Sequence, residues 1–298
     1  MSNFTSWEPR EHAHQWLIFP ENIGTHLSID EVALSQGELY TIVTNKKARG
    51  KKGCLIAIIA GTKAEEVTEH LCKIDYTKRL LVKEITLDMA NSMKLIAKKS
   101  FPKATQATDR FHVQKLALEA MQEIKIKHRW IAMNQENKDI AEAKSKGKAY
   151  HIELLGNGDT LKQLLVRSRY LLYKQNSKWT ANQQERAQLL FELYPEIKKA
   201  YSLNQRLRNI YNNNTNKLVA ITKLAHWYRE VEESGFENFN IIINAIKSNY
   251  QSILNYFDNR STNASAESFN AKIKLFRTQF RGVRKVDFFL FRLSKLFA

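Results

Sequence analysis

Apolar runs of strand length dominate the first third of the chain. Three segments separated by short turn-forming stretches each predict a strand: residues 23–30, 39–44 and 54–60. Because the connections are short, we expect an antiparallel meander. The third run, CLIAIIA, is apolar throughout, which indicates burial on both faces. Residues 62–72 then have the period of an amphipathic helix.

The next stretch passes twice through a strand and a helix. Strand 85–88 precedes a helix over 90–99, which Pro102 ends because the residue before a proline is disfavoured in helical geometry. A short strand over 104–108 follows, and a second helix begins soon after it. Three antiparallel strands followed by two crossover strands are the order of a ribonuclease-H-like mixed sheet, so we predict an α/β fold.

Helical periodicity continues almost without interruption beyond residue 112 and predicts a large all-helical insertion. Helices are expected over 113–130, 180–193, 195–211, 216–234 and 238–257, with another starting near the Gly-Asn-Gly break at 156–158. The predicted organisation is an N-terminal lead-in (1–22), a first part of the catalytic core (23–112), the insertion (113–258) and C-terminal helices that complete the core (259–298).

Net charge is the most informative feature of the composition. The 298 residues include 47 Lys and Arg against 30 Asp and Glu, a formal net charge of +17. Such an excess favours a polyanionic partner over an unspecialised basic surface or a membrane. No long apolar run and no signal-peptide pattern occur, so we expect a cytoplasmic protein. The two cysteines, Cys54 and Cys72, have no CxxC spacing and predict no zinc site.

Three acids stand where predicted elements begin or end. Asp30 and Asp88 follow strands, and Glu267 lies near the start of a late helix. Hard cations such as Mg²⁺ or Mn²⁺ bind carboxylate oxygens, and two such ions can support phosphoryl transfer. Each acid taken alone also suits a helix cap or an exposed loop, so the residue types leave both interpretations open.

Asp109 and His112 form a second group, about one turn apart at the start of a long helix. Asp109 can cap that helix while His112 is an ordinary polar residue of its first turn. The alternative is a supporting role, in which the pair orients metal ligands or a scissile phosphate.

Several segments resemble a known family. Residues 87–116 read LDMANSMKLIAKKSFPKATQATDRFHVQKL, and 261–284 read STNASAESFNAKIKLFRTQFRGVR. They resemble the core and the closing block of DDE transposases from bacterial insertion sequences, in the group with a D-R-F-H-V motif that is related to Mutator-like transposases. IDEVALSQGELYTIV, residues 29–43, resembles the first acidic strand of that family. The resemblance runs from about residue 27 to the end.

The resemblance implies roles for individual residues. Asp30, Asp88 and Glu267 would be the metal ligands for Mg²⁺ or Mn²⁺, with two ions. Asp109 and His112 would belong to the motif of the fifth strand, as supporting residues. Asn263 and Asn270 would support the site or contact the DNA backbone, although Asn263 suits a helix cap equally well. The residues expected to face DNA phosphates, or else to form a solvated face, are Lys272, Lys274, Arg277, Arg281 and Arg284.

The implied activity is metal-dependent cleavage and strand transfer of an insertion sequence, by a homo-oligomer on the element's ends and target DNA. The chain departs from the family in three respects. The tyrosine often found after the second acid is replaced in the segment 88–93, and Asn45 stands where relatives often have an aspartate. No zinc-binding or helix-turn-helix segment precedes the core. We therefore expect either a separately encoded N-terminal DNA-binding protein or a degraded copy. Two alternatives stay open: a catalytically inactive DNA-binding regulator, and a structure-specific nuclease of the same fold.

Overall fold

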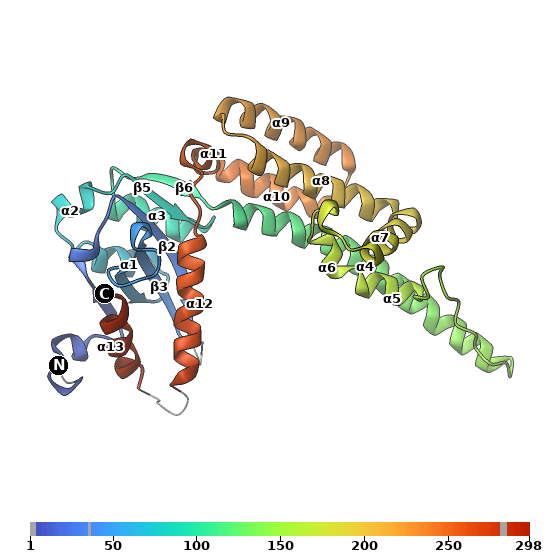
Figure 1. Cartoon of the computed structure of the whole chain (residues 1–298), viewed down its shortest axis with the longest axis horizontal. Helices are drawn as coiled ribbons and strands as arrows, with labels where there is room; N and C mark the ends of the chain where they lie inside the picture. Colours follow the sequence, from blue (N-terminus) through green and yellow to red (C-terminus); the bar gives the residue numbers. More distant parts are fainter. Residues whose placement is uncertain (1–3, 35–36, 281–284) are drawn as a thin grey trace. The chain divides into compact units, whose positions relative to one another are not determined.

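The chain forms two compact units, which are described separately below. The computed structural model describes residues 4–34, 37–280 and 285–298 (Figure 1). Unit 1 comprises residues 1–112 and 249–298, and unit 2 comprises residues 113–248. Residues 249–258, which were expected to belong to the insertion, are therefore in unit 1.

Unit 1 is built on a six-stranded mixed sheet with the order β1-β4-β3-β2-β5-β6. The strands are β1 (Trp16–Ile18), β2 (His26–Ala33), β3 (Leu39–Asn45), β4 (Leu55–Ala60), β5 (Glu84–Leu87) and β6 (Thr105–Thr108). The neighbouring pairs β1–β4, β4–β3 and β3–β2 are antiparallel, and the pairs β2–β5 and β5–β6 are parallel. The predicted ribonuclease-H-like α/β fold is confirmed.

Two strand predictions need correction. β1 pairs with β4 at the sheet edge, with Trp16 opposite Ile59, whereas no strand was expected in the lead-in. Three residues are too few to show a period of two, so the pattern could not reveal it. β2 extends to Ala33, which places Asp30 inside the strand rather than at its end.

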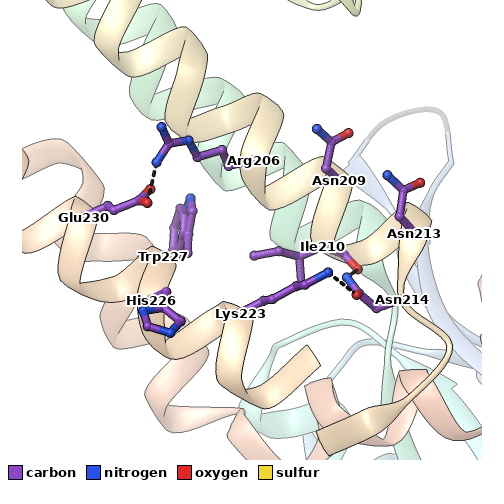
Figure 2. Close-up of a pocket in the computed structure, with 9 residues that line it drawn as sticks. All are labelled: Arg206, Asn209, Ile210, Asn213, Asn214, Lys223, His226, Trp227 and Glu230. Carbon is purple, nitrogen blue, oxygen red and sulfur yellow. Dashed lines mark hydrogen bonds and ion pairs between the residues drawn. The ribbon is translucent and has the colours of Figure 1, made fainter. Parts of the chain in front are cut away.

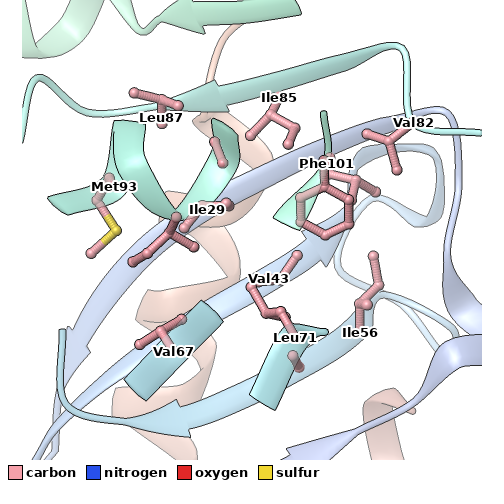
Figure 3. Close-up of a cluster of buried hydrophobic side chains, with 14 of the residues drawn as sticks. Ile29, Val43, Ile56, Val67, Leu71, Val82, Ile85, Leu87, Met93 and Phe101 are labelled. Carbon is pink, nitrogen blue, oxygen red and sulfur yellow. The ribbon is translucent and has the colours of Figure 1, made fainter. Parts of the chain in front are cut away.

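Helices α1 (Ala64–Leu71), α2 (Tyr76–Leu80) and α3 (Asn91–Ser100) follow β4 and β5. α1 and α3 pack against one face of the sheet, over a core that includes Ile29 and Leu87 (Figure 3). Since successive strand residues point to opposite faces, burying these two residues turns their neighbours Asp30 and Asp88 toward the other face. The apolar core thus decides which face carries the acids.

The second face packs on the C-terminal part of the chain. α12 (Ala264–Gln279) and α13 (Val286–Phe297) contribute Phe269 and Leu290 to a core with Ile42 and Ile58 of the sheet. α11 (Tyr250–Asn259) lies against β6, where the Ser252 and Thr108 hydroxyls are 2.8 Å apart. The Ser252–Thr108 contact joins residues 144 positions apart, and the contacts of α12 and α13 with the sheet span even longer separations.

Unit 2 is helical throughout. Its helices are α4 (Arg110–Ser145), which begins in unit 1, α5 (Leu161–Arg167), α6 (Arg169–Leu172), α7 (Ala181–Leu193), α8 (Pro195–Asn213), α9 (Lys217–Ser234) and α10 (Glu237–Ser248). The expected helix over 238–257 is interrupted at Asn249 and forms α10 and α11. Thr180 and Gln183 form a capping box at the start of α7. Among the described helices, none is long and apolar enough to cross a membrane.

Candidate active site

Three aspartates have equivalent positions relative to the three parallel strands: Asp30 lies in β2, Asp88 directly follows β5, and Asp109 directly follows β6. Ser28 of β2 pairs with Thr86 of β5, and Thr86 pairs with Ala107 of β6. Two positions further along each segment are Asp30, Asp88 and Asp109, which the register therefore aligns at one end of these strands. Asp30 and Asp88 point away from the core that contains Ile29 and Leu87, and Asp109 accepts a hydrogen bond from the first residue before α12. The fold brings together acids that are up to 79 positions apart.

α12 crosses this row of aspartates and adds Glu267. At its start, the backbone N–H of Asn263 donates a hydrogen bond to Asp109 Oδ2 at 2.8 Å. Two turns later, Asn270 Nδ2 donates to Asp30 Oδ2 at 2.8 Å. Glu267 lies between these contacts on the same helical face, because residues four and three positions apart are neighbours on a helix. Helix α12 therefore carries Glu267, the predicted third acid, toward the row of aspartates.

The Asp30 carboxyl is held in a desolvated position. Burial raises its pKa to about 6, and the negative charges of Asp88 and Glu267 add to that rise, whereas a hydrogen bond from the Glu31 amide and the nearby His112 oppose it. Two further negative charges thus act on the Asp30 carboxyl, an arrangement that favours a bound cation because a cation stabilises the ionised form.

Glu267 is electrostatically coupled to the same group. Burial and the charge of Asp109 raise the pKa of its carboxyl, and His112 lowers it. His112 is thus close enough to influence both Asp30 and Glu267, although its ring has no hydrogen bond to another described residue. Its ring instead packs edge-on against Phe111 at a centroid distance of 5.8 Å.

Asp88 and Asp109 differ in how their oxygens are used. Asp88 Oδ1 accepts a hydrogen bond from the Ala90 amide at 2.8 Å, which leaves its other oxygen without a hydrogen bond from any residue of the described ranges. Asp109 is 2 % exposed, and its two oxygens accept from the Phe111 and Asn263 amides. Asp109 therefore pins the start of α12 to the start of α4, whereas Asp88 retains an oxygen that can bind a ligand.

The two asparagines contact the row in different ways. Asn263 occupies the N-cap position of α12, but its side chain makes no capping hydrogen bond. The capping alternative for this side chain is therefore wrong. Both of its buried amide atoms lack a partner among the described residues, and so does Oδ1 of Asn270. Buried polar atoms normally find partners, so these three atoms are unusual in being left unsatisfied by the described chain, beside the row of acids.

A buried charged pair on the same face of β5 was not predicted from the sequence. Glu84 is 3 % exposed and lies 3.7 Å from the Lys46 ammonium, which also donates to the Thr86 hydroxyl at 2.7 Å. Asn259 donates to Glu84 at 2.8 Å, and Ser261 bonds to it as well. The pair ties the segment that follows α11 to β5, the strand that directly precedes Asp88. The spacing of two residues between Glu84, Thr86 and Asp88 was the available indication that Glu84 lies on the same face as the acid.

The predicted DNA-facing cations have different surroundings. Lys272 and Lys274 are both exposed. Lys272 also donates a hydrogen bond, at 3.1 Å, to the carbonyl of Gly50 on the loop between β3 and β4. Arg277 lies over the Phe289 ring at 5.1 Å from its centroid. Arg281 and Arg284 lie outside the described residues. Of the three described cations, Lys274 is the one whose ammonium has no polar or ring partner in the described chain.

The donor chemistry at the row suits a hard divalent cation. Asp30, Asp88 and Glu267 offer carboxylate oxygens, the ligands that Mg²⁺ and Mn²⁺ prefer, and Asn270 offers a buried carbonyl oxygen without a partner among the described residues. Over the described ranges, however, no three His, Cys, Asp or Glu side chains are close enough to hold a metal ion as they stand. The acids would have to approach one another on binding.

Unit 2 contains a separate pocket of about 280 Å³ between α8 and α9. Four of its polar groups bind one another: Lys223 donates to Asn214 at 2.7 Å, and Arg206 pairs with Glu230 (Figure 2). The indole of Trp227 donates to the Leu203 carbonyl at 2.8 Å. Among the described residues, Glu230 is the one acid that lines the pocket, so the pocket has no group of acids comparable to the row.

A mixed sheet with acids aligned across its parallel strands places the chain in the class of ribonuclease-H-like α/β proteins. A family model described as a transposase, the DDE transposase family of the ISL3 type, matches residues 27–293. Because that match covers most of the chain, the protein belongs to this family of insertion-sequence transposases. No curated protein and no solved structure matches the chain. The recognition from the sequence motifs is thereby confirmed, and the family implies DNA transposition.

Proposed function

We propose that the chain is a transposase that cleaves insertion-sequence ends and transfers them to target DNA with a divalent metal. The observation that carries this proposal is the alignment of Asp30, Asp88 and Asp109 across β2, β5 and β6, with Glu267 brought alongside by α12. In-line phosphoryl displacement needs negative ligands from several segments at one position, and these acids, which come from distant segments, would provide them once they converge on a metal.

Each residue has a proposed part. Asp30, Asp88 and Glu267 would hold Mg²⁺ or Mn²⁺, with two ions. When bound, the metal supplies activation of the attacking hydroxyl and stabilisation of the leaving oxygen. Asn270 orients the Asp30 carboxylate through its 2.8 Å hydrogen bond, and Asp109 fixes the start of the helix that carries Glu267. His112, near two of the acids, would contact a scissile phosphate.

The cations around α12 would position DNA. Lys274 is exposed and free to contact a phosphate, which positions a duplex without reading its sequence. Lys272, Arg277, Arg281 and Arg284 are proposed for the same task. An assembly of several copies on the DNA, and a separately encoded protein that reads the ends, belong to the same proposal.

A second candidate, the catalytically inactive DNA-binding regulator, is favoured by one observation. The described side chains do not already form a three-ligand metal site. The two candidates differ in whether DNA and metal together draw the three acids into contact. An enzyme requires that convergence, whereas a regulator only has to bind DNA.

A strand-cleavage assay tests the proposal. Purified protein is incubated with labelled DNA carrying the element's end, with Mg²⁺ or Mn²⁺, and with the product of the adjacent upstream reading frame where one exists. The proposal expects nicks at the end and joining to a target. Binding without any nicking under every metal would favour the regulator. Cutting of branched junctions in preference to linear ends would favour the structure-specific nuclease.

A further inference from the structure

Unit 2 contains a cluster of three cations that comes from two helices. Lys125 and Arg129 are four residues apart on α4 and therefore lie on one helical face. Arg169 begins α6, and its backbone carbonyl accepts a hydrogen bond from Gln122, one turn before Lys125, at 3.5 Å. The two arginines are close enough to Lys125 to act on its ionisation. The fold thus gathers three positive charges.

No acid balances this cluster. Across residues 4–34, 37–280 and 285–298, none of these three side chains has an ion pair or a hydrogen bond to a side chain. The Arg169 guanidinium instead lies beside the ring of Tyr170, which is 69 % exposed. Elsewhere in unit 2 buried charge is neutralised, as when Arg167 and Arg186 pair with Asp159.

Lys125 is the unusual member because it is only 4 % exposed. Burial, with the charges of Arg169 and Arg129, lowers the pKa of its ammonium to about 8. A buried cation beside two further cations destabilises the unbound protein, and an apolar side chain of similar length would fill the space at lower cost. An anion that reached the cluster would remove this penalty.

We propose that Lys125, Arg129 and Arg169 form a binding site for the phosphate backbone of DNA on the helical unit. The exposed ring of Tyr170 next to Arg169 provides a surface for the adjoining sugar or base. The site deepens the proposed function, on which it rests, by giving the helical unit its own contact with DNA. It requires no catalysis and no metal.

The test measures binding and stability of the full chain in EDTA. Fluorescence anisotropy with a short labelled duplex of arbitrary sequence, and with its single strand, gives the affinity over a series of salt concentrations. The variants are Lys125→Met, which keeps the apolar stem, the triple variant Lys125→Met/Arg129→Ala/Arg169→Ala, and the control Lys127→Met. Lys127 is an exposed cation on the same helix and lies on a different face.

The site predicts that the triple variant binds DNA about tenfold or more weakly. The slope of log affinity against log salt should become shallower by about 0.9 for each phosphate that the variant no longer neutralises. Lys125→Met alone weakens binding and raises the thermal midpoint, because the unbound protein no longer buries a cation. Lys127→Met leaves the affinity within about twofold, a smaller change than removal of a direct phosphate ligand produces.

Three results would overturn the site: an unchanged affinity in the triple variant, an equal reduction in Lys127→Met, or a lower thermal midpoint in Lys125→Met. A wild-type chain that binds neither the duplex nor the single strand would overturn it as well. Failure of catalysis is separate from these outcomes. An Asp88→Asn chain that cannot nick would still bind DNA through this cluster, and a nicking-competent chain could lack the site.

Discussion

Glu84 in unit 1 and Asp159 in unit 2 are both buried carboxylates whose charge is completely matched. Glu84 binds Lys46 and two polar side chains, and Asp159 binds Arg167 and Arg186. Asp30 and Lys125 are also largely buried, yet neither has an oppositely charged partner in an ion pair within the described parts of the chain. Each unit therefore contains one kind of buried charge that is neutralised and one that is not.

The difference separates two uses of charge. A matched pair joins segments far apart in sequence, as Glu84 does for the segment that follows α11, and it leaves nothing for a ligand to bind. An unmatched buried charge destabilises the free protein and is compensated only by something from outside. We therefore infer that the acids of unit 1 await a cation, and that the cations of unit 2 await an anion.

The largest expected effect is on cleavage. Asp88→Asn should lower the rate of metal-dependent nicking by about a thousandfold or more, because an amide is a poor ligand for a hard cation and carries no charge. Its thermal midpoint should stay close to wild type. Glu31→Gln is the matched control, since Glu31 is exposed and adjacent to Asp30 but points to the other face of β2.

Equal loss of nicking in the control would show that charge on this strand, and not the aligned row, sets the rate. Nicking that persists in Asp88→Asn at the wild-type rate would remove Asp88 from the site.

Alanine at a matched carboxylate should act on stability. Glu84→Ala leaves the half-buried Lys46 ammonium without its acid, and Asp159→Ala does the same for Arg186, so each should lower the free energy of unfolding by about 1.5–3 kcal/mol. Urea unfolding followed by circular dichroism measures the loss. Glu142→Ala removes an exposed acid paired with Lys146 and should cost under about 1 kcal/mol. Similar losses in all three variants would refute the distinction between matched and exposed pairs.

A smaller effect is expected from the residue that orients Asp30. Asn270→Ala removes the 2.8 Å hydrogen bond to that carboxylate and should raise the Mg²⁺ concentration for half-maximal nicking by about ten- to a hundredfold. The maximal rate at saturating metal should change less. Leu275→Ala, at an exposed position of the same helix, should leave the metal requirement unaltered. A pure loss of protein stability, with the metal requirement unchanged, would contradict the orienting role.

The smallest effect concerns the pH dependence of Lys125. Its pKa is about 8 in the folded chain against 10.5 for the free side chain, so the cost of burying the charged form is complete below pH 8 and is relieved as the pH rises toward 10.5. Lys125→Met should therefore be more stable than wild type by about 1–2 kcal/mol at pH 7. Thermal midpoints of both proteins from pH 6.5 to 9.5 measure the difference, which should shrink above about pH 8. A difference that grew with pH would contradict an unmatched ammonium.

The hydrophobic pattern predicted the sheet well where strands are long or apolar. It missed β1, which is too short to show a period, and it merged α10 with α11 because the break at Asn249 leaves the apolar spacing intact. The acids could be proposed from their positions beside strands. Their alignment could not, because it depends on the register between β2, β5 and β6.

Buried charges were the hardest feature to foresee. Glu84 and Lys125 look like ordinary surface residues in the sequence. What distinguishes them is the set of neighbours that the fold brings from elsewhere: Lys46 and Asn259 for the first, and Arg169 for the second. No local pattern encodes whether a charge will be matched.

The central claim is that Asp30, Asp88 and Glu267 together form the site that binds divalent metal during cleavage. Anomalous scattering from Mn²⁺ in crystals of the chain bound to its end DNA tests it most directly. We predict manganese density in contact with carboxylate oxygens of all three residues, and its loss in Asp88→Asn. Manganese bound elsewhere, or a DNA complex in which Glu267 stays out of reach of the two aspartates, would contradict the claim.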